Sequence, residues 1–171
     1  MNPPPLKLIF IARDNAPHVR AAWEKLEPDV LAQPSIQFVA VEYGESDLDF
    51  RDAEIAVVLG GDGSILHACR QMGANQIPIL GVNLGRLGFL ADVSPQEFRS
   101  DLELLGAREF HVVDYLMYQC KLIGADGAEE VHLGLNEVVI SSGASFSMID
   151  VHLAINENDA PEEITTSFNP R

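Results

Sequence analysis

Three glycines surround one acidic residue in the segment Leu-Gly-Gly-Asp-Gly-Ser at residues 59–64. The segment follows the apolar run 55–58, which is typical of a buried parallel strand ending where α/β sheets bind their ligands. We expect Gly61 and Gly63 to need a positive φ or a close approach of the backbone to a phosphate. The Asp62 carboxylate could hold a metal ion or take a proton from an attacking hydroxyl. This combination indicates phosphoryl transfer, and the alternative is a tight strand-to-helix turn with a capping aspartate.

Strand and helix signals alternate through the first half of the chain. Apolar runs predict strands over residues 6–11, 36–41, 55–59 and 77–82. Helical spacing of apolar residues predicts two helices between them, with buried stripes over Val19–Leu26 and Ile65–Met72. Ser94–Glu97 has the form of a capping box, and Phe98–Leu105 continues that helix on one face. The βαβ pattern predicts a mostly parallel sheet with flanking helices.

The second half of the chain favours β-structure. Three mostly apolar stretches predict strands without a convincing helix between them: His111–Ile123, Val131–Ile140 and Met148–Ile155. Residues 156–171 have no strand period and predict a disordered tail. We therefore expect an α/β fold in which an N-terminal Rossmann-like parallel sheet with flanking helices, over residues 1–108, precedes an incomplete β-rich domain of β-sandwich type over residues 109–171.

Composition and charge limit the partners. The 171 residues are 47% hydrophobic and 22% charged, as in soluble globular proteins. A formal net charge of −15 argues against nucleic acid and anionic membranes as partners, but it leaves a nucleotide possible as a small ligand. The apolar stretches are too short to cross a bilayer, and the first residues lack the apolar core of a signal peptide. Cys69 and Cys120 lack metal-ligand spacing, so we expect a reduced, cytoplasmic setting.

Three segments together resemble the successive motifs of the bacterial NAD kinase (ATP-NAD kinase) family: Gly60–Ser64, Leu80–Leu90 and Leu135–Ile140. The glycine-aspartate loop alone also occurs in lipid kinases and phosphofructokinases. The second motif is long and distinctive, however, and the third follows at a fitting distance. The resemblance covers residues 6–155. It implies transfer of the γ-phosphate of ATP to the 2′-hydroxyl of the adenosine ribose of NAD, which forms NADP.

The resemblance also implies roles for individual residues. Asp62 is the implied catalytic residue, which draws the proton from the 2′-hydroxyl. The implied nucleotide-binding residues are Asp62, Gly63, His67, Phe89, Asn136, Glu137 and Ser147. Asn136 and Glu137 match the pair that hydrogen-bonds the dinucleotide. From the residues alone, His67 fits an exposed helix position equally well, and Phe89 is either a wall for the adenine ring or an ordinary core residue.

The family implies partners that the residues alone do not specify. A divalent metal cation, Mg²⁺, and ATP as phosphoryl donor follow from the resemblance, as does a homo-oligomer in the intact family. The motifs do not identify which residues would bind the metal ion.

The carboxyl end departs from the family pattern. Family members continue with an Asp-Gly segment and a Thr-Pro-Thr-Gly-Ser-Thr-Ala-Tyr-type motif that completes the dinucleotide site, and residues 156–171 do not match it. Either the sequence is a fragment or its reading frame changed near residue 156, so we expect reduced or no activity. Two alternatives stay open: another kinase with the same loop, acting on a lipid or sugar phosphate, and a non-catalytic nucleotide-binding remnant.

Overall fold

The computed structural model describes residues 3–44, 50–85, 88–91, 93–123, 126–135, 139, 150–157 and 160–167. The chain forms two compact units, Met1–Asn136 and Glu137–Arg171. Over the described residues, no helix combines the length and the apolar character needed to cross a membrane.

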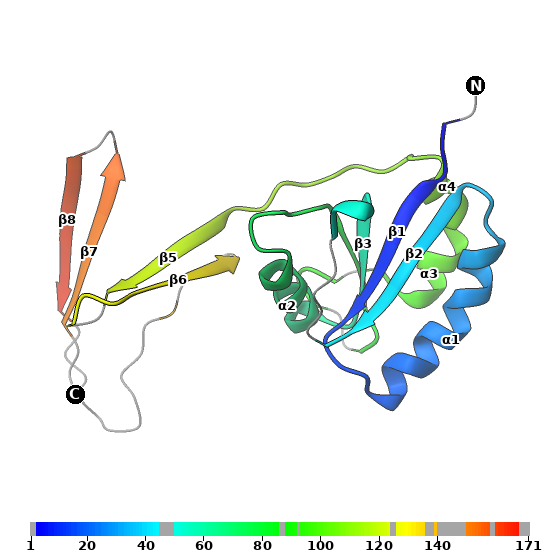
Figure 1. Cartoon of the computed structure of the whole chain (residues 1–171), viewed down its shortest axis with the longest axis horizontal. Helices are drawn as coiled ribbons and strands as arrows, with labels where there is room; N and C mark the ends of the chain where they lie inside the picture. Colours follow the sequence, from blue (N-terminus) through cyan, green and yellow to red (C-terminus); the bar gives the residue numbers. More distant parts are fainter. Residues whose placement is uncertain are drawn as a thin grey trace. The chain divides into compact units, whose positions relative to one another are not determined.

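The first unit is built on a parallel sheet of four strands (Figure 1). The strands are β1 (Leu6–Ala12), β2 (Ile36–Tyr43), β3 (Ile55–Leu59) and β4 (Ile79–Val82), in the order β2-β1-β3-β4. All three pairings are parallel, which confirms the predicted α/β class. β4 begins two residues later than predicted because Pro78 has no N–H group to donate to a neighbouring strand.

Helices cover both faces of this sheet. Figure 1 shows α1 (Pro17–Ala32), α3 (Pro95–Ser100) and α4 (Leu102–Gly106) on one side and α2 (Asp62–Met72) on the other. Side chains of the central strands alternate between the two layers: Leu8 and Phe10 pack toward α1, whereas Ile9 and Ile11 pack toward α2. This double burial explains why β1 and β3 are nearly continuous apolar runs.

The predicted capping box is confirmed at the start of α3. The Glu97 N–H donates to Ser94 Oγ at 3.2 Å, and the Ser94 N–H donates to Glu97 Oε2 at 2.8 Å. The predicted single helix through Leu105 is wrong, because it divides at Asp101, whose ψ of 5° lies outside the helical range. The Ser100 hydroxyl donates to Glu97 O and contacts Asp101 Oδ1, and such side-chain bonds compete with continued helix.

Within the described residues of the second half, the β-structure consists of two antiparallel hairpins. In the first unit, β5 (Met117–Ile123) pairs with β6 (Glu129–Leu135). Met117 lies opposite Leu135, and both side chains pack against the core cluster on the α2 face of the sheet. The expected domain start at residue 109 and the partial β-sandwich stay predictions.

In the second unit, β7 (Asp150–Glu157) pairs with β8 (Ala160–Ser167). The prediction of disorder over residues 156–171 is therefore wrong for β8. The β-branched residues Ile164, Thr165 and Thr166 favour an extended backbone, and β7 supplies the pairing partner that their local pattern does not reveal.

An aromatic cluster under α1 gives a test of the core. The fully buried Phe10 ring lies 4.4 Å from the Trp23 ring and 6.0 Å from the Phe98 ring, measured between centroids. We expect Phe10→Ala to lower the free energy of unfolding by about 3–5 kcal/mol, because it leaves a cavity where three elements meet. Phe110→Ala, at a residue that is 37% exposed, should cost about 1 kcal/mol or less. Urea unfolding measures both, and equal losses would contradict this description of the core.

Candidate functional site

The carboxyl ends of β1, β3 and β4 meet at a hollow of about 290 Å³. The chain turns away in opposite directions from β1 and β3, and such a switch point is where open α/β sheets bind ligands. The lining includes Arg13, His18, Gly60, Gly61, Ser64 and Asn83. We therefore place the candidate site at this edge of the sheet.

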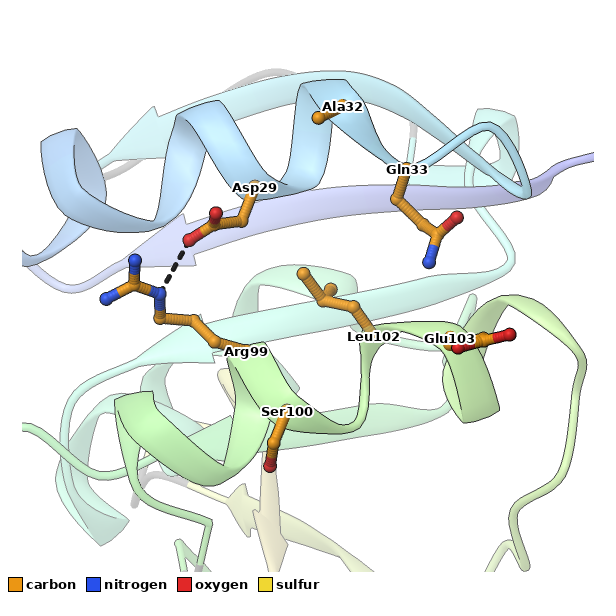
Figure 2. Close-up of a pocket in the computed structure, with 7 residues that line it drawn as sticks. All are labelled: Asp29, Ala32, Gln33, Arg99, Ser100, Leu102 and Glu103. Atoms are coloured by element: carbon orange, nitrogen blue, oxygen red, sulfur yellow. Dashed lines mark hydrogen bonds and ion pairs between the residues drawn. The ribbon is translucent and has the colours of Figure 1, made fainter.

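A larger hollow of about 510 Å³ lies between α1, α3 and α4 (Figure 2). Figure 2 shows Arg99 of α3 reaching Asp29 of α1, with Arg99 Nε 2.6 Å from Asp29 Oδ2. This hollow lies at the carboxyl end of α1, where Gln33 leads back to the start of β2. It therefore lies at the amino edge of the sheet, away from the glycine-aspartate loop. We do not place the candidate site there, although this hollow is the larger of the two.

The glycine loop turns at Gly60, which was not the residue expected to do so. Gly60 has a φ of +148°, and a Cβ there would lie 2.2 Å from Ser64 Oγ. Gly61 has a φ of −97° and is the N-cap of α2, with nothing within 4 Å of an added Cβ. A Cβ at Gly63 would make an ordinary 3.7 Å contact with Arg13 Nη1. Neither Gly61 nor Gly63 has a positive φ, because the chain turns at Gly60, directly after the end of β3. For these two residues, a close approach of the backbone to a phosphate stays a prediction.

Asp62 is the first residue of α2, so it is not the capping residue of the alternative interpretation. Its carboxylate instead accepts three backbone N–H groups from a distant segment. The N–H of Phe89 donates to Oδ2 at 2.9 Å, and those of Leu90 and Ala91 donate to Oδ1 at 3.0 and 3.2 Å. A carboxylate accepts about four hydrogen bonds, so Oδ2 retains capacity for one more donor.

These N–H donors hold the pKa of Asp62 below its ordinary value. Phe89 has the largest effect, followed by Leu90; partial burial opposes them and Ala91 adds a smaller lowering. Hydrogen bonds to the charged form stabilise that form, so the Asp62 carboxylate is ionised at neutral pH.

Two other predicted site residues lie in the described part of the chain. Phe89 is 98% exposed, so the core-packing interpretation is wrong, while contact with an adenine ring stays a prediction. His67 lies five residues after Asp62 on α2, which turns it about 140° away around the helix axis. Its Nε2 is buried and has no hydrogen-bond partner among the described residues. Its role in nucleotide binding stays a prediction.

Three further predicted residues, Asn136, Glu137 and Ser147, lie outside the described residues. Sequence reasoning also missed two residues that the structure brings to the site. Arg13 directly follows β1, and its guanidinium lies beside Gly63. Asn83 directly follows β4; its Nδ2 donates to Ala91 O at 3.1 Å and its Oδ1 accepts the Gly85 N–H at 2.9 Å. Their positions after predicted strands could have identified both.

The residues of this site do not fit a metal held by the protein alone. Within the described ranges, no three His, Cys, Asp or Glu side chains group closely enough to bind a metal ion. The Asp62 carboxylate is also largely occupied by backbone donors. Mg²⁺ commonly keeps its waters and binds substrate phosphates, so the expected cation stays an expectation.

Comparison with known proteins identifies the family. A family model for the ATP-NAD kinase N-terminal domain matches residues 20–110, which is more than half of the chain. The chain belongs to the ATP-NAD kinase family.

Individual relatives agree with this assignment. An NAD kinase of Rhodopirellula baltica is 36% identical over 151 residues, which cover 87% of this chain and 48% of that protein. An NAD kinase of Geobacter sulfurreducens is 42% identical over 106 residues, covering 61% of this chain and 37% of that protein. This member of the ATP-NAD kinase family therefore spans less than half of the length of each of these two relatives.

The fold is similar to that of a solved relative as well. The crystal structure of yeast NADH kinase complexed with NADH matches with a TM-score of 0.72 at 20% identity, covering 86% of this chain and 49% of that one. This structural similarity supports the α/β fold described above for this member of the ATP-NAD kinase family.

The turn at Gly60 generates a paired prediction. We expect Gly60→Ala to lower the free energy of unfolding by about 1–3 kcal/mol, because φ is positive and the added Cβ overlaps Ser64. Gly63→Ala should leave stability unchanged or raise it slightly, since it adds a helix-favouring residue in available space. Thermal and urea unfolding of both variants measure this. Equal effects of the two substitutions would show that the Gly60 conformation is not required.

Proposed function

We propose that this chain carries the phosphoryl-transfer site of an ATP-dependent NAD kinase. Asp62 carries the proposal: it is an ionised carboxylate at the carboxyl edge of the sheet, and one of its oxygens can still accept a hydrogen bond. The family model and both relatives described above are those of NAD kinases, whereas none of them is a lipid kinase or phosphofructokinase.

In the proposed reaction, the 2′-hydroxyl of the adenosine ribose of NAD donates a hydrogen bond to Asp62 Oδ2. The 2′-oxygen forms a bond to the γ-phosphorus of ATP, and the bond between that phosphorus and the β–γ bridging oxygen breaks. The hydroxyl proton passes to Asp62, and the products are NADP and ADP. A lowered pKa makes Asp62 a weak base, which suits a loose transition state in which the proton moves late.

The hollow beside α2 is the proposed position of the ATP phosphates. Gly61, which caps α2, and Ser64 in its first turn both line this hollow, and the backbone N–H groups and dipole at the start of a helix favour an anion. Arg13 adds a guanidinium, which suits phosphate oxygens. In a protein with a formal charge of −15, such local positive groups are needed to attract a nucleotide.

The remaining assignments rest on the family resemblance. We propose that the exposed Phe89 ring contacts the adenine of NAD. The other proposed nucleotide-binding residues are Gly63, His67, Asn136, Glu137 and Ser147. Mg²⁺ with ATP, a homo-oligomer and a cytoplasmic location belong to the same proposal.

The role of Asp62 is tested by Asp62→Asn, which keeps the side-chain shape and removes the charge. We expect NADP formation from NAD and ATP to slow by about 10²–10⁴-fold, the range for loss of a general acid–base group. A coupled assay for NADP measures the rate, with circular dichroism to confirm folding. Undiminished turnover in Asp62→Asn would contradict the assignment, and nucleotide binding by the unmodified chain without NADP formation would favour the non-catalytic remnant.

The phosphate position is tested by Arg13→Ala. We expect the affinity for ATP to fall about tenfold or more, because a hydrogen bond to a charged group is lost. Arg99→Ala is the matched control, since Arg99 lies in the hollow at the amino edge of the sheet. Titration calorimetry with ATP measures both, and similar losses in the two variants would rule out the proposed phosphate position.

A further inference from the structure

The segment 88–91 approaches Asp62 so closely that residue 88 must lack a side chain. A Cβ built on Gly88 would lie 2.1 Å from Asp62 Oδ1, 2.6 Å from Cγ and 2.8 Å from Oδ2. The side chain of Asp62 is short and held by three N–H donors, so it cannot move aside without losing them. An alanine at position 88 and the observed Asp62 contacts therefore exclude each other.

The same segment is tied to the end of β4 at its base. The Asn83 N–H donates to Val93 O at 2.8 Å, and Val82 and Val93 form an isolated parallel bridge. Asn83 Nδ2 also holds the carbonyl of Ala91. Because the chain leaves β4 at Asn83 and returns beside it at Val93, the 88–91 segment is positioned over the start of α2.

The arrangement of donors distinguishes the two carboxylate oxygens. Among the described residues, Oδ1 accepts two N–H groups and Oδ2 accepts one. Each oxygen offers two acceptor positions, so with respect to these donors Oδ1 is filled and Oδ2 has one position left. The rotation of the carboxylate about its Cβ–Cγ bond is fixed by the same three bonds.

We propose that Gly88 is a positioning residue for the phosphoryl transfer: it lets the 88–91 segment close on Asp62, whose Oδ2 is thereby left to receive the substrate hydroxyl. The identity of that hydroxyl rests on the proposed function. The positioning itself rests on the contacts between Gly88, Asp62 and the three N–H donors.

The close approach of the 88–91 segment to Asp62 also links the carboxylate to the exposed aromatic ring of Phe89. The Phe89 N–H donates to Asp62, and the Phe89 side chain is 98% exposed. The position of the ring and the orientation of the carboxylate therefore depend on the same backbone segment. A substitution at Gly88 disturbs both, although residue 88 itself contributes no functional group.

The test compares Gly88→Ala with Gly85→Ala in the 171-residue chain, without nucleotides. We expect Gly88→Ala to raise the pKa of Asp62 toward its ordinary value and to accelerate amide exchange at Leu90 and Ala91 about ten- to a hundredfold, because bonds to a charged acceptor are lost. Gly85→Ala should change neither, since its Cβ would lie 4.0 Å from the nearest atom. NMR titration of the carboxyl group and hydrogen exchange measure these effects. Unchanged values in Gly88→Ala would overturn the proposal.

Combining Gly88→Ala with Asp62→Ala covers the case in which Gly88→Ala alone does not fold. Asp62→Ala removes the three atoms nearest to an added Cβ, so Gly88→Ala should be tolerated in that background. We expect Asp62→Ala alone to accelerate exchange at Leu90 and Ala91, with no further acceleration in the double variant. Further acceleration of exchange in the double variant, or failure of the double variant to fold, would overturn the proposal. Because these readouts need no NADP formation, failure of the kinase assignment is distinguished from failure of the positioning role.

Discussion

The burial of β1 and β3 on both faces is the constraint on which the rest of the first unit depends. All five residues of β3 are buried, and so is every residue of β1 except Lys7. A shift of one residue in either strand would exchange the side chains that face α1 with those that face α2. The strand ends are therefore fixed relative to each other, and Arg13 and Gly60 reach the same edge of the sheet.

At that edge, the Asp62 carboxylate combines two requirements that oppose each other. Three N–H donors hold it in place and keep it ionised, but the same donors make it a weaker base. A reaction that needed a strong base would be hindered by this environment. Phosphoryl transfer tolerates it, because much of the catalysis comes from positioning and charge stabilisation.

Local patterns predicted the elements better than the contacts between them. The run 55–59 coincides with β3, and the Ser94–Glu97 box opens α3. Both signals lie within a few adjacent residues. The hydrogen bond from the Phe89 N–H to the Asp62 carboxylate joins residues 27 apart in the sequence, and no local pattern of residues predicts it. Gly60 was not predicted to make the turn, because three glycines so close together do not reveal which of them takes the positive φ. β8 was missed because its strand structure depends on pairing with β7, which its own local pattern does not reveal.

The hairpin of β5 and β6 has a consequence for the behaviour of the protein in solution. Apolar side chains on and beside these strands are exposed, among them Leu116, Leu122, Ile123 and Val131. The formal charge of −15 makes copies of the chain repel one another. That repulsion extends over about 10 Å at 0.1 M salt but only about 3 Å at 1 M. Self-association through the exposed apolar side chains should therefore increase with ionic strength, so low-salt buffers should keep the chains dispersed.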